Sequence, residues 1–156
     1  MFYEPKKGSP LKIDPFKSLI FPRPIGWISS ISKNGIANLA PYSYFNAVAD
    51  EPPQVMFCSN GSSAHSKYKD SLSNILSTEE FVVNFVTSAL RNQMNISSRD
   101  FKPDEDEFFL SNLKRKKSKL VKPPSVKDSP VNLECKLVKT FKLKSSSKNI
   151  STMVIG

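Results

Sequence analysis

This 156-residue sequence has few of the residues on which several common kinds of protein depend. Its two cysteines, Cys58 and Cys135, lie far apart and outside any CxxC spacing, which argues against a disulfide framework and against a structural zinc site. It contains neither GxGxxG nor GxxxxGK[ST], so a nucleotide would not be held by a Rossmann or P-loop turn. We expect no metal site.

Long apolar runs are also missing. No stretch approaches the roughly 20 apolar residues that would span a bilayer. Residues 1–10 have neither the apolar core nor the small-residue cleavage site of a secretory signal. A hydrophobic content of 38% and a mean hydropathy of −0.34 fit one folded domain with a core of its own. We therefore expect a cytoplasmic protein with no membrane partner.

Acidic residues are scarce only in the last third of the chain. The net charge is +9, and the excess of lysine lies after Leu110. The basic run 114–119 could bind nucleic acid, but no aromatic residues that could stack on bases are interleaved with it. A solvated lysine-rich loop is the favoured interpretation. A basic nucleic-acid-binding barrel is kept as the least favoured of three functional hypotheses.

The most informative stretch is a predicted β-hairpin between Pro22 and Asn46. Residues 25–32 alternate and are rich in β-branched side chains, which predicts a strand, and residues 33–35 carry the Asn-Gly turn signal. Residues 37–46 form the predicted return arm. Pro41 in this arm cannot donate a hydrogen bond to a neighbouring strand, so the strand must be an edge, bulged or broken there.

Several other short strands and few helices are predicted. The patterns favour strands at 54–59, 80–87, 131–138 and 152–155, helices capped by Asp70 and Ser88, a short helix after the acidic run 104–107, and a proline- and lysine-rich connection at 111–129. This arrangement predicts a mainly β protein, a β-barrel with helical decorations.

These segments, in this order, resemble the flavin reductase-like group of FMN-binding split-barrel proteins, which includes the flavoredoxins. The resemblance rests on the segments RPIGWIS (23–29), NLAPYSYFN (38–46), PP (52–53), KDS (69–71), NI (74–75), EFVVN (80–84), EF (107–108) and SPVNLEC (129–135). It implies an antiparallel, Greek-key-like split barrel at 21–156, preceded by an extension at 1–20. It also implies a homodimer with FMN at or near the dimer interface.

The activity implied by this resemblance is hydride transfer from NAD(P)H to a flavin, with reduced flavin passed to a monooxygenase or another electron acceptor. No catalytic side chain is expected, because the flavin carries the chemistry. The alternative, from a different class, is an FMN-binding electron carrier without NAD(P)H turnover of its own. The sequence does not separate these two, and it does not distinguish NADH from NADPH.

The resemblance assigns the edge of the flavin ring to the second arm of the hairpin. A proline-containing strand leaves backbone groups free for the polar ring edge, and nearby aromatic side chains can cover its faces. The predicted ring contacts are Asn38, Ala40, Pro41, Tyr42, Ser43, Phe45 and Asn46.

The phosphate of FMN needs several hydrogen-bond donors and positive charge. The resemblance assigns the phosphate to Ser29, Ser30, Lys69 and Ser71, with a predicted helix beginning near Ser71; Ser59 and Asp70 are further predicted cofactor contacts. Each has a structural alternative: the serines can be satisfied by the backbone, Asp70 can be a helix cap, and Lys69 can be an exposed lysine. His65, the only histidine, is more simply an exposed loop residue.

One departure from the family pattern concerns the end of the chain. Family members typically continue the barrel after the strand predicted at 152–155, whereas this sequence stops at Gly156. We therefore expect a barrel that is incomplete at its C-terminus.

Overall fold

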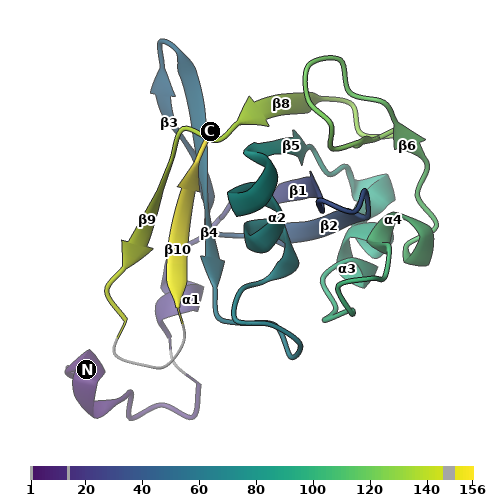
Figure 1. The fold of residues 1–156 in the computed structure, drawn as a ribbon. Helices are drawn as coiled ribbons and strands as arrows, with labels where there is room; N and C mark the ends of the chain where they lie inside the picture. The colour runs from purple at the N-terminus through teal and green to yellow at the C-terminus, as the bar shows by residue number, and fades with distance from the viewer. Residues whose placement is uncertain (1, 14, 146–149) are drawn as a thin grey trace.

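The computed structural model describes residues 2–13, 15–145 and 150–156. Within these residues, two antiparallel sheets carry the main strands, and short helices lie in the connections (Figure 1). The predicted mainly β fold with a few short helices is confirmed. The first sheet holds β1 (Gly26–Ile31), β2 (Ala37–Tyr42), β5 (Glu80–Asn84) and β8 (Asn132–Lys136); the second holds β3 (Phe45–Asp50), β4 (Pro53–Asn60), β9 (Lys139–Leu143) and β10 (Ser151–Ile155).

The helical elements of the described residues are all short. They are α1 (Phe16–Leu19), α2 (Asp70–Thr78), α3 (Arg91–Ile96), α4 (Glu107–Leu110) and two 3₁₀ turns, Pro5–Lys7 and Ser88–Leu90; a two-residue ladder joins β6 (Arg115–Lys116) to β7 (Ser125–Val126). None of the helices in this part of the chain is long and apolar enough to cross a membrane.

The order of the strands puts β2 at an edge. The first sheet runs β2-β1-β5-β8 and the second runs β3-β4-β10-β9. In the hairpin, Trp27 lies opposite Pro41 and Ser30 lies opposite Asn38. The expectation that Pro41 belongs to an edge strand is confirmed. The return arm is shorter than predicted, because β2 ends at Tyr42 and the chain then crosses to β3 in the second sheet.

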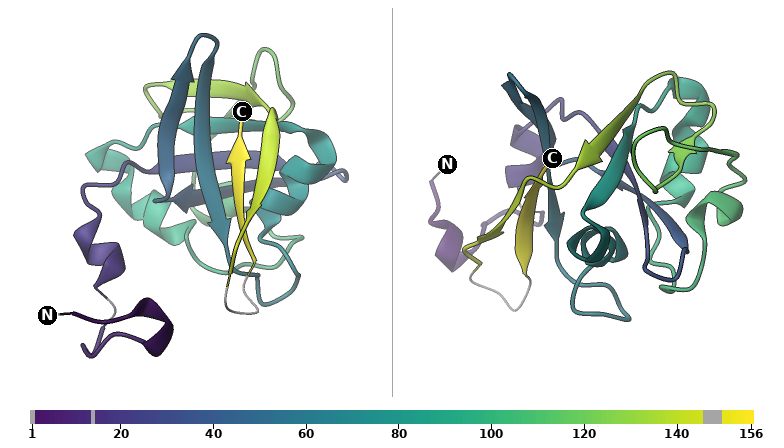
Figure 2. Two further views of the ribbon diagram at one scale, coloured as in Figure 1. Left: turned by 90° about the vertical axis from the view of Figure 1, so that its left-hand side faces the viewer. Right: turned by 45° about the horizontal axis from the view of Figure 1, so that its top comes forward.

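The two sheets enclose the main apolar core, and their strands cross one another in the left view of Figure 2. This core joins side chains of both sheets with those of α2 and includes Ile28, Tyr42, Phe57, Leu72, Ile75, Phe81, Val83 and Val154. A second cluster covers the other face of the first sheet and includes Trp27, Leu39, Leu90, Phe108 and Val126. Both faces of β1 and β2 are therefore buried, and the outer edge of β2 is left at the margin of the core.

Two strands and two caps differ from the sequence-based expectations. β3 and β9 are edge strands with mostly exposed side chains, so they lack the apolar face that marks a strand in sequence. Asp70 is not the N-cap of α2. The cap is Lys69, with an extended backbone (φ −66°, ψ 149°), and Asp70 is the first helical residue. Ser88 does not cap a helix: it is the first residue of a 3₁₀ turn whose cap is Thr87, and α3 follows with Leu90 as its cap.

The aromatic centre of the core gives a direct test of the fold. Phe57 is fully buried. Its ring centroid lies 4.7 Å from that of Tyr42 and 5.7 Å from that of Phe81. Phe57→Ala should lower the free energy of unfolding by about 3–5 kcal/mol, measured by chemical denaturation, because it leaves a cavity between the sheets. Phe109→Ala is the matched control: Phe109 is 82% exposed, and we expect a change of less than about 0.5 kcal/mol. Equal effects would contradict this packing.

Candidate functional site

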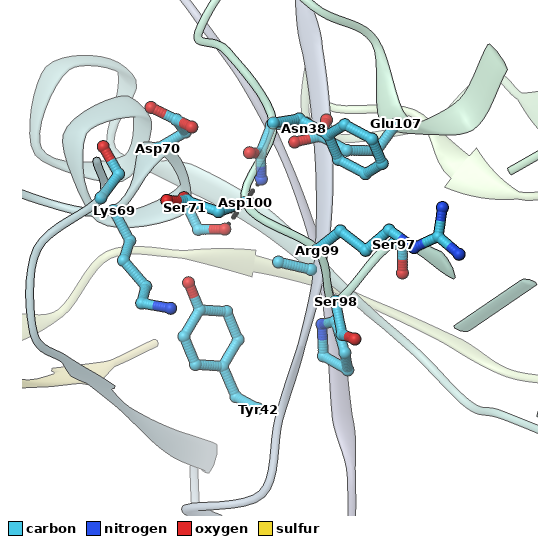
Figure 3. A pocket seen from close by; sticks show the side chains of 14 residues that line it. Asn38, Tyr42, Lys69, Asp70, Ser71, Ser97, Ser98, Arg99, Asp100 and Glu107 are labelled. Atoms are coloured by element: carbon cyan, nitrogen blue, oxygen red, sulfur yellow. Dashed lines mark hydrogen bonds between the residues drawn. The ribbon is translucent and has the colours of Figure 1, made fainter. Parts of the chain in front are cut away.

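A small polar pocket lies against the outer edge of β2 (Figure 3). Its volume is about 60 Å³, room for a few water molecules or one anion of phosphate size. The lining comes from β2, from the start of α2, from the loop after α3 and from α4: Asn38, Ala40, Pro41, Tyr42, Ser63, Lys69, Asp70, Ser71, Ser97, Ser98, Arg99, Asp100, Phe101 and Glu107. We call this the β2 pocket.

The N-terminal end of α2 opens onto the β2 pocket through Lys69, Asp70 and Ser71. No side chain of the described residues caps this helix, so its first N–H groups are left for another partner. In Figure 3 the Lys69 side chain extends toward the Tyr42 hydroxyl. Helix N–H groups beside a lysine ammonium are suited to an anion.

Two buried hydroxyls beside this pocket lack partners. Neither Tyr42 Oη nor Ser59 Oγ has a hydrogen-bond partner among the described residues. Burial raises the pKa of Tyr42 to about 12, while the nearby Ser71 and Ser59 hydroxyls lower it in part, so the phenol remains a neutral donor at physiological pH. A buried hydroxyl without a partner costs about 1–3 kcal/mol. Both groups fit a site that a polar ligand completes.

A buried carboxyl closes the back of the pocket. Glu107 is 5% exposed, and its Oε2 accepts a hydrogen bond of 3.2 Å from the backbone N–H of Leu39. That N–H points away from β1, so Glu107 occupies the position that a neighbouring strand would have at this edge. Burial raises the pKa of Glu107 to about 7; the N–H groups of Glu107 and Leu39 lower it in part, and the charges of Asp70 and Glu105 raise it further.

Seven of the predicted site residues meet in the β2 pocket. They are Asn38, Ala40, Pro41, Tyr42, Lys69, Asp70 and Ser71. The Asn38 amide and the Ser71 hydroxyl are hydrogen-bonded at 2.8 Å, which ties β2 to α2. Burial raises the pKa of Asp70, as does the charge of Asp100, against smaller opposite effects of His65 and Lys69. That these seven residues bind FMN stays a prediction.

The structure places the two serines of β1 on opposite faces of the first sheet. The Ser29 hydroxyl donates to the carbonyl of Pro124 at 2.6 Å and accepts from the Asn84 amide at 3.1 Å. Ser30 faces α2, and its hydroxyl accepts from the Asn74 amide at 3.1 Å. Neither serine lines the β2 pocket, because both hydroxyls serve the packing of the sheet.

The remaining predicted contacts do not line the pocket. Ser43 is in the bend between β2 and β3. The Phe45 ring packs against Gly26, where an added Cβ would come within 2.6 Å of the ring, and the Asn46 side chain accepts from the N–H of Ala47 at 3.0 Å. Ser59 is buried on β4, next to Tyr42.

The sequence analysis missed the far wall of the pocket. This wall consists of residues 97–101 together with Glu107. Asp100 Oδ2 accepts from the N–H of Ala64 at 2.9 Å, and Ser97 Oγ accepts from Trp27 Nε1 at 2.9 Å, so the loop is held from two sides. The acidic run 104–107 was interpreted as the start of a helix, and Glu107 was part of the family resemblance, but neither observation assigned Glu107 to the site.

A second pocket is larger and mainly apolar. It has a volume of about 770 Å³ and lies between β8, the β3–β4 hairpin and Gly156. Leu120, Leu133 and Val138 contribute to its lining, with Lys119, Glu134 and Lys136. None of the predicted site residues lines it.

Comparison with known families gives a match to the model of the flavin reductase like domain over residues 18–156. An uncharacterised protein of Aquifex aeolicus is 46% identical over 121 residues, which cover 78% of this chain and 61% of the relative. The chain therefore spans less than two thirds of the length of this relative.

Solved structures with the same fold include component B of nitrilotriacetate monooxygenase from Bacillus cereus. Its TM-score is 0.89 and its sequence is 29% identical. The match covers 100% of this chain and 77% of that protein. A putative flavin reductase with a split-barrel domain from Shewanella frigidimarina has a TM-score of 0.73 and 22% identity, over 86% of this chain and 63% of that protein. The expected split-barrel fold is confirmed.

The Glu107 carboxyl generates a prediction about stability. Its folded-state pKa lies above the ordinary value of 4.5, so the folded protein binds more protons than the unfolded chain between about pH 4.5 and pH 7. The stability that protonated Glu107 provides is therefore present at low pH and is lost as the pH rises through 7. Relative to Glu107→Gln, the wild-type free energy of unfolding should fall by up to about 3 kcal/mol between pH 5 and pH 8.

Chemical denaturation at several pH values checks this prediction. Asp104→Asn is the control, because Asp104 is an exposed carboxyl in the same segment. Its pH profile should run parallel to that of the wild type. A parallel profile for Glu107→Gln would show that Glu107 does not titrate in this window.

Proposed function

The chain belongs to the family of flavin reductase like domains, and from this premise we propose that it binds FMN and transfers hydride from NAD(P)H to a flavin. The observation that carries the proposal is the β2 pocket, where a helix start without a side-chain cap, a lysine and an unpartnered buried hydroxyl meet at the free edge of a strand. Lys69, Ser71 and Tyr42 would hold the phosphate. The pocket is of the size of that group rather than of the whole cofactor.

We place the flavin ring along the free edge of β2, next to the β2 pocket. Because the N–H of Leu39 points outward to Glu107, the carbonyls of Leu39 and Pro41 point outward as well. Pro41 has no N–H, so this part of the edge presents acceptors, which suit a ring N–H. The chain then passes through the bend at 43–44, where polar and aromatic side chains alternate.

A bound flavin supplies the hydride-accepting ring, so the residues of this chain have to bind and orient it. The aromatic core behind β2 fixes the strand that carries the ring contacts, since Tyr42 packs on Phe57 with 4.7 Å between ring centroids. Lys69 and the start of α2 fix the phosphate. No side chain is required as a nucleophile.

The proposal extends to partners. Large exposed apolar side chains gather in the N-terminal segment, at Leu11, Ile13, Phe16, Leu19, Ile20 and Phe21, and an exposed apolar surface of this kind favours a homodimer. One structural relative is component B of a monooxygenase, which supports a monooxygenase as the acceptor of reduced flavin.

FMN titration followed by addition of NADH or NADPH tests the function. We expect quenching of flavin fluorescence on binding, and oxidation of the reduced nicotinamide that depends on added flavin. Tight FMN binding without oxidation of either nicotinamide would favour the electron-carrier alternative. Absence of FMN binding would contradict both.

The phosphate contact can be tested separately. Lys69→Gln should weaken FMN binding by about ten- to a hundredfold, because one charge-assisted contact is lost. Riboflavin, which has no phosphate, should bind the variant and the wild type equally. Lys67→Gln is the matched control, since Lys67 is exposed in the same loop and does not line the pocket. Equal losses for the two flavins would place the phosphate elsewhere.

A further inference from the structure

The segment between α4 and β8 presents a strongly basic surface. Residues 114–127 include six lysines and no acidic residue, and all six lysines are exposed: Lys114, Lys116, Lys117, Lys119, Lys122 and Lys127. We call these six side chains the lysine array. The one other cation of this stretch, Arg115, is paired with Asp106 before α4, so it is not counted with the array.

The backbone that carries the lysine array is fixed from inside. The two-residue ladder between β6 and β7 holds its ends together, and the Ser118 hydroxyl donates to the carbonyl of Pro123 at 2.6 Å. The N–H of Val126 donates to the Asn84 side chain at 2.8 Å, which ties the segment to the first sheet. A solvated loop therefore describes the lysine side chains but not this backbone. A surface on a fixed backbone loses less conformational freedom when it binds a partner.

Two nearby carboxylates hold this backbone and not the ammonium groups. The Glu134 side chain accepts from the N–H of Lys119 at 2.9 and 3.0 Å and from that of Leu120 at 2.6 Å. The Glu80 side chain accepts from the N–H of Lys122 at 2.8 Å. Among the residues that the structure describes, no lysine of the array forms an ion pair. Its ammonium groups are therefore available to an anionic partner.

Two lysines of the array stand opposite each other. The N–H of Lys127 donates to the carbonyl of Lys114 at 2.9 Å, next to the ladder of β6 and β7. Like charges that face each other across paired strands repel. Asp128 follows in the sequence but pairs with neither lysine in the described part of the chain. A negative group bound between the two ammonium groups would relieve this repulsion.

The composition of the surface favours a protein over a nucleic acid as the anionic partner. Leu120 lies within the array and is 78% exposed, and a protein partner can bury such a side chain whereas a phosphate backbone cannot. Residues 114–127 contain no aromatic side chain that could stack on bases. Their only guanidinium, the group suited to bidentate contact with phosphate, is already paired with Asp106.

We propose that the lysine array, with Leu120, is a docking surface for an acidic segment of a partner protein that carries an apolar side chain among its acids. Opposite charge selects this partner and speeds its approach, and burial of Leu120 fixes its position. Because ion pairs between exposed side chains are individually weak, the complex is short-lived and sensitive to salt.

The docking surface lies beside the β2 pocket. Asp106 caps α4 and also pairs with Arg115 of β6, so β6 is attached to the helix that carries Glu107 into the pocket lining (Figure 1). A partner bound to the array is therefore close to the proposed flavin site. That this partner is the acceptor of reduced flavin rests on the proposed function, whereas the docking surface itself does not.

Fluorescence anisotropy with three labelled probes, without flavin, tests the docking surface. The probes are a glutamate-rich peptide with central leucines, the same peptide with serines in place of the leucines, and single-stranded DNA of equal charge. The leucine peptide should bind about tenfold more tightly than the serine peptide, because it buries Leu120, and Leu120→Ser should remove this difference. Tighter binding of the DNA, equal binding of both peptides, or no binding would overturn the proposal.

Two triple variants separate the array from the net charge of the protein. Removing three array charges should weaken the leucine peptide by about tenfold, through loss of three exposed ion pairs, in Lys116→Gln/Lys117→Gln/Lys119→Gln. The control removes the same charge from exposed lysines at β9 in the second sheet, with Lys139→Gln/Lys142→Gln/Lys144→Gln. It should bind the peptide as the wild type does. Equal losses in both variants would show that only net charge matters and would overturn the docking surface.

FMN titration of the array variant keeps this inference apart from the proposed function. None of its three substituted lysines lines the β2 pocket, so its affinity for FMN should equal that of the wild type. Wild-type protein that binds the leucine peptide but not FMN supports the docking surface and contradicts the proposed function. Binding of FMN without binding of the peptide has the opposite meaning.

Discussion

The free outer edge of β2 is the constraint on which the site depends. A strand at the edge of a sheet has unpaired backbone groups, and these must find partners if they are buried. The N–H of Leu39 donates to the Glu107 carboxyl, and Pro41 has no N–H that would need a partner. What remains is a short row of carbonyls beside the start of α2, and the β2 pocket forms where these two features meet.

The alternation of side chains along a strand explains why only part of the predicted phosphate site comes together. Asn38 faces α2, and so does Ser30, which lies opposite it on β1. Ser29 is one residue away and points to the other face, where the Asn84 amide and the carbonyl of Pro124 bind it. Adjacent serines in a strand cannot serve one ligand from one face, a limit that follows from the period of two.

The hairpin, the edge position of Pro41 and the mainly β fold were predictable because they depend on local signals: alternation, an Asn-Gly turn and a proline. Lys69 and Ser71 were predictable as a pair because they start one helix. Glu107 and residues 97–101 were not, because their approach to β2 depends on tertiary packing of distant segments. Edge strands β3 and β9 were missed for a related reason: they bury too little to show a pattern.

The charges of the β2 pocket explain why a carboxyl at its back is compatible with an anion site. Two cations, Lys69 and Arg99, share the lining with three acids, Asp70, Asp100 and Glu107. With all three ionised, the lining would repel a phosphate. Burial raises the pKa of Asp70 and that of Glu107. The acids at the helix start and at the back of the pocket therefore lose their charge at a higher pH than ordinary carboxyls, and a bound anion would strengthen that tendency. Under the proposed function, the phosphate would enter this acid-rich pocket with an uptake of protons, without additional basic residues.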